Sequence, residues 1–193
     1  MAAIVVSVEP SEEPVSIEEA KAHLRVDIED DDNLILNLIT AARKKTETIL
    51  KRSLITQTLI YYPDEWPDSD YIELPLPPLQ SVTSVIYTDY AGTATTLTQN
   101  TDYVADIKKD PGRIVLDYGM TWPTTTLDVT SPIAITYIAG YGTPEDVPMP
   151  IKQAILILAA DYYENRESYI VGQTPSHIKT VEALLGPYIC HHF

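Results

Sequence analysis

Residues 151–163 are apolar at nearly every position of a helical repeat, and this segment constrains the fold more than any other in the chain. The segment follows Pro148, Met149 and Pro150, and proline is tolerated in the first turn of a helix. A helix without a polar face must be enclosed. The longest uninterrupted apolar run, 154–160, is far shorter than the roughly 18 residues that cross a bilayer. We therefore expect other parts of the protein, and no membrane, to enclose this helix.

Two further helices are predicted near the N-terminus. The sequence Ser16-Ile17-Glu18-Glu19 is a capping box that begins a helix running to about Arg25. An acidic run at 27–32 precedes a second, longer helix, whose apolar residues recur every three or four positions: Leu34, Ile35, Leu38, Ala41, Ala42, Ile49 and Leu50. Its acidic start, and a basic end formed by Arg43, Lys44, Lys45, Lys51 and Arg52, would both complement the helix dipole. The apolar faces of these helices are the expected cover for residues 151–163.

Between the helical segments the pattern changes to short β-branched and aromatic runs. These runs lie at 55–62, 71–74, 82–88, 103–106, 113–117 and 132–138, and Pro-, Asp- and Gly-containing turns separate them. Parallel strands would need crossover helices, which this region lacks, so antiparallel hairpins are expected.

The predicted class is α+β, with a helical core of two N-terminal helices and a buried C-terminal helix, an inserted antiparallel β domain and an extended C-terminal tail. The core takes residues 1–53 and 148–168, the β domain takes 54–147, and the tail takes 169–193. Within the tail, the apolar residues from Ile178 to Leu185 would form one short helix.

The charge distribution argues against nucleic-acid binding. The net charge is −15, and residues 54–149 hold 13 acidic and 3 basic residues. Because binding to phosphates needs clustered Lys and Arg, we expect DNA to pass such a surface without specific binding. The single cysteine, Cys190, excludes an intrachain disulfide and a cysteine-cage metal site, which fits assembly in a reducing cytoplasm.

No catalytic, cofactor-binding or metal-binding residues are predicted. The acidic run at 27–33 has Asp32 where a calcium loop needs glycine and Leu38 where it needs glutamate, so helix capping is favoured. The adjacent ligands Cys190, His191 and His192 rarely converge on one ion. His23 and His177 are expected to be surface or packing residues. The carboxylates of Asp64, Glu65, Asp68 and Asp70 on a Pro-rich loop are expected to be solvated.

Aromatic usage leaves two interpretations open. The chain has thirteen tyrosines and two tryptophans against one phenylalanine. Tyrosine and tryptophan are favoured at protein interfaces, but tyrosine is also common in strands. The exposure of the individual side chains decides between these interpretations.

Several motifs, in matching order, resemble the head-tail connector proteins of tailed bacteriophages, in the long form with a β insertion between helices. Those motifs are Ser16 to Asp27 with Asp32-Asn33-Leu34, the Pro-rich stretch Leu74 to Val82, Tyr103 with Pro111-Gly112-Arg113-Ile114, and Pro150 to Ile155 continuing through Tyr163 to Glu167. The resemblance covers residues 15–168, and only the ending at 189–193 departs from it.

This resemblance implies a structural protein of the virion, located at the head-tail interface and assembled in the host cytoplasm. It implies a homo-oligomeric ring, commonly of twelve copies, that binds the portal protein and meets the next connector, stopper or tail protein. No cofactor is implied, and DNA passes through the channel. We expect the segment after Glu167 to become ordered against the portal, and its predicted docking residues are Ile178, Val181, Leu184, Leu185 and Tyr188.

Alternatives from other classes remain at this stage. The main alternative is a different structural role in the same particle, such as a stopper, tail terminator or baseplate piece, although the two flanking helical segments favour the connector. The aromatic β region also fits a carbohydrate- or cell-surface-binding module. An enzyme ranks third, because none of the nucleotide-binding or acyl-transfer motifs occurs.

Overall fold

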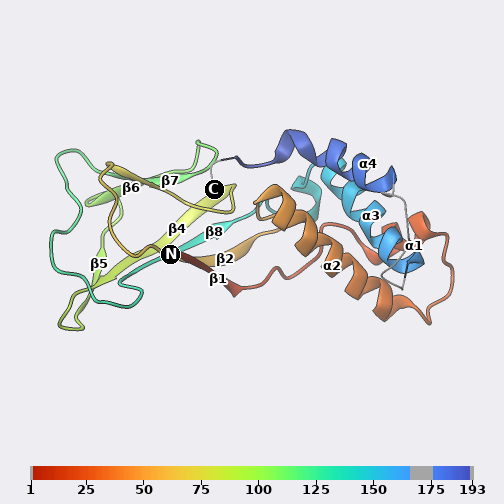
Figure 1. The fold of residues 1–193 in the computed structure, drawn as a ribbon, viewed down its shortest axis with the longest axis horizontal. Helices are drawn as coiled ribbons and strands as arrows, with labels where there is room; N and C mark the ends of the chain where they lie inside the picture. Colours follow the sequence, from red (N-terminus) through yellow and green to blue (C-terminus); the bar gives the residue numbers. More distant parts are fainter. Residues whose placement is uncertain (1, 166–175, 192–193) are drawn as a thin grey trace. The chain divides into compact units, whose positions relative to one another are not determined.

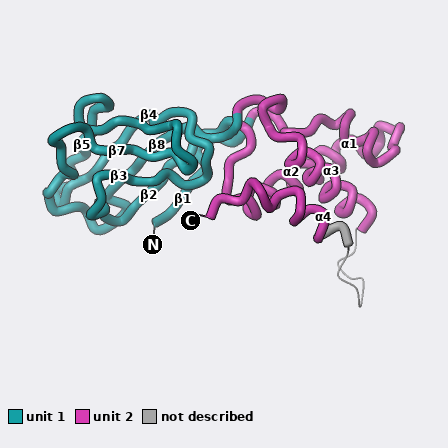
Figure 2. The backbone as a smooth tube through the Cα atoms, turned by 90° about the horizontal axis from the view of Figure 1, so that it is seen from above, with its two compact units in different colours: residues 1–10, 56–141, 192–193 teal, residues 11–55, 142–191 magenta. Residues whose placement is uncertain are grey.

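The chain folds into two compact units in the computed structural model, which describes residues 2–165 and 176–191 (Figures 1 and 2). The first, here called the β unit, contains residues 2–10 and 56–141. The second, the helical unit, contains residues 11–55, 142–165 and 176–191. The predicted α+β class is confirmed, with an antiparallel β region inserted between helical segments.

The units divide the chain differently from the expected ranges. Residues 54–55 and 142–147, which the sequence places in the β domain, belong to the helical unit. Residues 2–10, which the sequence places with the helical core, belong to the β unit because β1 (Ala3–Val8) pairs with β2 (Gln57–Tyr62). The last described segment, 176–191, belongs to the helical unit instead of forming a separate tail, because α4 (Ser176–Leu185) packs against α3 (Met149–Glu164).

Sequence-encoded caps set the start of the helical unit. In α1 (Ile17–Leu24), the Ser16 hydroxyl accepts from the Glu19 amide at 3.2 Å, and the Ser16 amide donates to the Glu19 carboxylate at 2.8 Å, so the predicted capping box is confirmed. The long helix α2 (Asp32–Leu50) follows, and short 3-10 turns η1 (Pro144–Asp146) and η2 (Gly186–Tyr188) precede α3 and follow α4.

The apolar helix α3 is enclosed, as its sequence requires. It packs against α1 and α2 and against α4. Its fully or almost fully buried residues are Ile151, Ala154, Ile155, Leu158 and Ala159. Ala20 of α1 and Ile35 and Ile39 of α2 form a buried cluster, on which Leu156 and Tyr163 pack. The three predicted helices therefore share one core, and α4 is added to it.

The β unit consists of two antiparallel sheets (Figure 1). The larger sheet has the order β1-β2-β8-β4-β5, in which β4 spans Leu79–Thr88, β5 spans Ala94–Leu97 and β8 spans Ile133–Ala139. The smaller sheet has the order β3-β7-β6, with β3 at Tyr71–Glu73, β6 at Tyr103–Asp106 and β7 at Arg113–Leu116. The outer strands β1 and β5 are the two that the sequence runs do not include.

Both sheets contribute to one core. Every second residue of β8 is buried, which gives Ile133, Ile135, Tyr137 and Ala139 to the interior. Ile72 and Ile114 come to the same cluster from the smaller sheet. The buried Tyr137 hydroxyl donates to the Pro75 carbonyl at 2.6 Å, and burial raises the pKa of Tyr137 well above its ordinary value. This contact fixes the Pro-rich entry to β4 onto the core.

Candidate functional site

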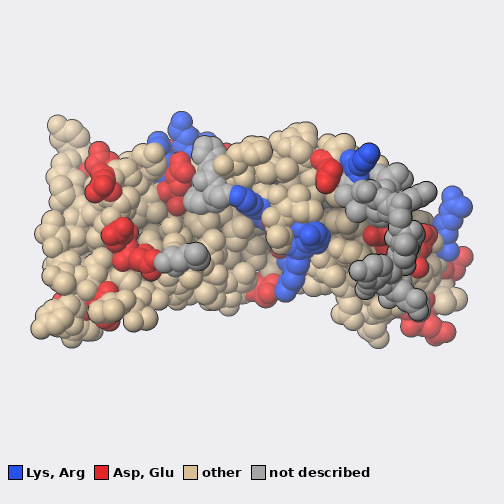
Figure 3. Space-filling view, viewed as in Figure 1, with Lys and Arg blue, Asp and Glu red and all other residues tan. Residues whose placement is uncertain are grey.

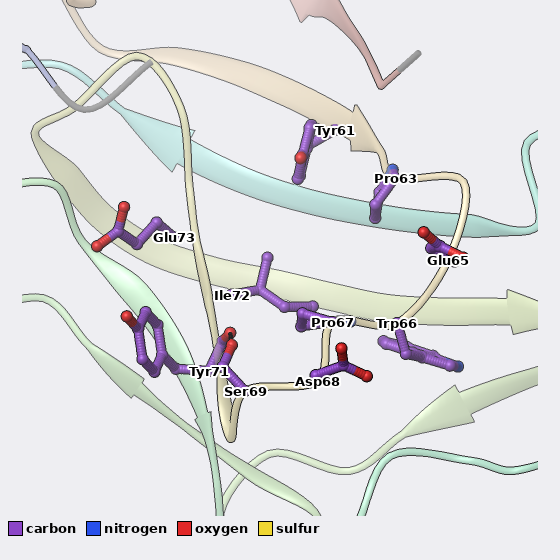
Figure 4. Close-up of a pocket in the computed structure, with 10 residues that line it drawn as sticks. All are labelled: Tyr61, Pro63, Glu65, Trp66, Pro67, Asp68, Ser69, Tyr71, Ile72 and Glu73. Carbon is purple, nitrogen blue, oxygen red and sulfur yellow. Dashed lines mark hydrogen bonds between the residues drawn. The ribbon is translucent and has the colours of Figure 1, made fainter.

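A hollow of about 590 Å³ in the β unit is lined partly by aromatic side chains (Figure 4). It is lined by Tyr61, Pro63, Glu65, Trp66, Pro67, Asp68, Ser69, Tyr71, Ile72 and Glu73. Carbohydrate-binding sites use aromatic rings beside carboxylates. Whether this hollow could bind a sugar therefore depends on whether its ring faces are free.

Two of the aromatic rings at this hollow pack against neighbouring side chains. Trp66 stacks on Trp122 with ring centroids 4.9 Å apart and an interplanar angle of 5°, and it meets Tyr87 edge-on at 6.0 Å. The Tyr71 ring is covered by the Arg113 guanidinium carbon, 4.9 Å from its centroid. These contacts stabilise the loop between β2 and β3 and take one face of each ring, while Tyr71 keeps 38% of its surface exposed.

The loop that borders the hollow carries four carboxylates. Asp64, Glu65, Asp68 and Asp70 are all exposed, as the sequence predicts for solvated loop charges. Figure 4 shows Glu65 and Asp68 at separate places on the rim, on either side of Pro67. Across the described residues, no group of three or more His, Cys, Asp or Glu side chains is placed to hold a metal ion.

The acidic residues at the start of α2 bind side chains of α1 and α3 instead of capping α2. Asp31 is the N-cap residue, but its side chain makes no capping hydrogen bond and accepts from the Tyr163 hydroxyl of α3. Asp32 pairs with Lys21 of α1 at 2.7 Å, and this bond raises the pKa of Lys21. The predicted capping by this run is therefore wrong for Asp31, because a tertiary partner takes its carboxylate.

Arg43 has a role that the sequence does not show. The predicted basic end of the second helix is wrong for this residue, because α2 continues to Leu50 and Arg43 lies two turns before its end, with 3% of its surface exposed. Its guanidinium donates to Glu13 at 2.7 Å and to Glu47 at 2.9 Å. Glu47 also accepts from the Leu54 amide at 3.0 Å. This network links the segment before α1 to the end of α2.

Burial makes Glu47 a pH-dependent contributor to stability. Desolvation raises its pKa, and the Arg43 charge and the Leu54 amide oppose that rise without cancelling it. A carboxyl whose folded pKa is raised contributes stability below its unfolded pKa, and that contribution is lost as the pH rises through the folded value. We therefore expect the free energy of unfolding of the native chain, relative to a Glu47→Gln variant, to fall from pH 4 to pH 7. Urea unfolding at several pH values checks this, and a constant difference contradicts it.

The predicted docking residues fall into two groups in the structure. Val181 and Leu185 of α4 are buried at 3% and 0% exposure, whereas Leu184 and Tyr188 are partly exposed. The Ile178 side chain lies outside the described residues. Around η2, the Tyr188 carbonyl accepts from Arg52 at 2.6 Å, and the Cys190 amide donates to Leu50 at 2.9 Å. Residues 176–188 are thus helical, and they pack within the helical unit of the chain itself, without a partner.

The histidine and cysteine predictions have separate outcomes. Cys190 is buried and His191 is exposed, while His192 lies outside the described residues. His23 is exposed on α1, as expected for a surface histidine, and the side chain of His177 lies outside the described residues.

Several apolar side chains are exposed at positions that the sequence pattern does not predict. Tyr90 and Tyr118, in loops of the β unit, are 79% and 101% exposed, whereas Tyr103 and Tyr137 are buried in its core. Tyrosine therefore lies both in the sheet core and at the exposed surface. In the helical and β units as described, no helix has the length and apolar character needed to cross a membrane. On the face drawn in Figure 3, acidic and basic side chains form small separate groups.

Comparison with known proteins finds a matching family and solved structures with a similar fold. The model of the phage gp6-like head-tail connector protein family matches residues 14–109. No curated protein matches the chain. A chain in the structure described as "Neck of empty GTA particle computed with C6 symmetry" is 26% identical, with a TM-score of 0.76, and the alignment covers 100% of this chain and 97% of that chain.

Two further solved structures have the same fold. A chain from the "Neck of native GTA particle computed with C12 symmetry" is 24% identical with a TM-score of 0.77, covering 100% of this chain and 97% of that one. A chain from the "Virion of native gene transfer agent (GTA) particle" is 22% identical with a TM-score of 0.80, covering 98% and 96%. The family match agrees with the resemblance carried by the sequence motifs, and residues 14–109 therefore belong to the phage gp6-like head-tail connector family.

Proposed function

We propose that this chain is a structural subunit of the neck of a tailed-phage-like particle, where it forms a ring that binds the portal and links the DNA-filled head to the tail. The observation that carries the proposal is the likeness to a neck chain over the full length of both proteins, at 26% identity. The connector family match over residues 14–109 supports the same role. A twelvefold ring is proposed because one of the similar neck structures has that symmetry.

The proposed role is structural and needs no cofactor or catalysis. DNA would pass through the channel without specific binding, since the net charge of −15 opposes tight phosphate contacts. A sugar-binding role is disfavoured, because one face of the Trp66 ring and one face of the Tyr71 ring are already packed against Trp122 and Arg113. The subunit would be assembled in the host cytoplasm and then belong to the virion.

Portal contact is assigned to the C-terminal segment that contains α4 and η2. Of the docking residues predicted from the sequence, Leu184 and Tyr188 have accessible surface, so they are the proposed contacts. Val181 and Leu185 would support them from inside by holding α4 on the helical unit. The next connector, a stopper or a tail protein would then meet a different surface of the ring.

Native mass spectrometry of the purified chain, alone and mixed with isolated portal rings, tests this function. We expect the chain to join the portal in a fixed ratio, with one copy per portal subunit. A protein that stays unbound at a tenfold excess of portal contradicts the proposal and favours a tail component. Tight binding of duplex DNA by the assembled ring at physiological salt would contradict the proposed passive channel.

A further inference from the structure

The two outer strands of the five-stranded sheet carry no charged side chain. β1 (Ala3–Val8) forms one edge, and β5 (Ala94–Leu97) forms the other. In the sequence, no charged side chain precedes Glu9, and none lies between Asp89 and Asp102. Proteins commonly protect open sheet edges with charges, especially lysine, or with proline. Both edges of this sheet lack that protection.

β1 exposes apolar side chains on both of its faces. Ile4, Val5, Val6 and Val8 are 41%, 48%, 40% and 58% exposed. Within the described part of the chain, this strand pairs with β2 and with no other strand. Its outer backbone edge therefore lies beside a strip of apolar surface, which is the arrangement that an added strand would cover.

β5 presents a second open edge of compatible chemistry. Among the described residues it pairs with β4 alone, with Thr95 opposite Tyr87 and Thr96 opposite Ile86. Ala94, Thr95 and Thr96 are exposed, and threonine is a β-branched residue suited to strands. Another uncharged strand could extend the sheet here without placing a charge at the junction.

We propose that β1 of one subunit pairs with β5 of the neighbouring copy, so that the five-stranded sheets join from subunit to subunit around the ring. This inference rests on the proposed ring. A closed ring needs two unlike surfaces on each subunit, whereas β1 pairing with a second β1 would form a twofold dimer. The outer strands of the smaller sheet fit less well, because β3 carries Glu73 and β6 carries Asp106.

Disulfide trapping tests the pairing directly. In a chain with Cys190→Ala, cysteines at positions 4, 5 or 6 are combined with cysteines at 94, 95 or 96, for example Val5→Cys with Thr95→Cys. The proteins are mixed with portal rings, oxidised and separated under denaturing conditions. Disulfides form only where the two Cα atoms lie within about 7 Å, so the set samples the strand register. We expect at least one pair to give a ladder of covalent multimers.

Controls separate this inference from the proposed function. Val5→Cys combined with Tyr118→Cys, whose position is fully exposed but off both edges, is expected to give no ladder. A covalent dimer from Val5→Cys alone would indicate β1–β1 pairing and overturn the inference. Portal binding without a ladder from any pair also overturns it, and leaves the proposed function intact. Failure to join the portal, together with the absence of any ring assembly without cross-linking, overturns both.

Charge substitutions at the same two edges give an independent measurement. Val5→Lys and Thr95→Lys each place a charge at an exposed position, so both variants should fold normally by circular dichroism. Each is expected to lower the fraction of assembled subunit at least tenfold, and Val5→Lys combined with Thr95→Glu is expected to restore assembly. Unchanged assembly by both lysine variants would contradict the β1–β5 pairing.

Discussion

An Arg43→Met substitution is expected to lower the free energy of unfolding of the helical unit by about 3–5 kcal/mol. The guanidinium is almost wholly buried and pairs with both Glu13 and Glu47. Removing it takes away the cation that offsets the desolvation of Glu47, whose pKa burial already raises. The cost arises mainly from the buried carboxylate that remains, and less from the ion pairs themselves.

Urea unfolding followed by circular dichroism measures this effect. Lys45→Met is the matched control, because Lys45 lies on the same helix with its side chain exposed. Its effect should stay within about 0.5 kcal/mol. Combining Arg43→Met with Glu13→Gln and Glu47→Gln should recover part of the loss by removing the two anionic charges. If Arg43→Met costs no more than Lys45→Met, the network does not contribute to stability.

The second large effect is expected from Leu185→Ala, which should cost about 2–5 kcal/mol. Leu185 is fully buried in α4, where the helix packs against α3. Truncating the side chain removes apolar contacts and leaves a cavity between elements of the helical unit. Thermal unfolding should show a lower midpoint, and removal of the whole segment should act in the same direction.

Leu184→Ala is the neighbouring comparison, because Leu184 is only partly buried. If this residue contacts the portal, its substitution should weaken portal binding while the unfolding midpoint changes much less than for Leu185→Ala. Binding is measured by titrating portal rings and counting bound copies. Equal portal binding by Leu184→Ala and the native chain would remove Leu184 from the docking surface, whatever the stability result for Leu185.

Local signals in the sequence were sufficient to predict much of the fold. The capping box at Ser16 depends on residues three positions apart, and the structure contains both of its hydrogen bonds. The requirement to enclose residues 151–163 follows from composition alone, and α1, α2 and α4 provide the cover. The run at 132–138 likewise predicts a strand, and β8 lies there, at Ile133–Ala139.

The remaining features depend on partners that are distant in the sequence. Arg43 follows Ala41 and Ala42 and precedes two lysines, so nothing local distinguishes it from a solvated helix residue. Its burial depends on Glu13, thirty residues earlier. β1 and β5 lack the alternation of apolar and polar residues, because neither strand buries one face: every residue of β1 and three of the four in β5 are exposed. The exposure of these strands, which makes them candidates for pairing with a neighbouring copy, is thus also the reason that the sequence pattern did not predict them.

The inserted topology also affects the order in which the chain can fold during synthesis. Ile55 and Gly142, at the two ends of the insertion, form a bridge within the helical unit. At about 5–20 residues per second, α1 and α2 would leave the ribosome roughly 5–20 s before α3, because the whole β region is made between them. Until then, their apolar faces lack the helix that covers them. A ribosome-bound chain ending before residue 149 should therefore expose these faces to chaperones, because α3 has not yet been made.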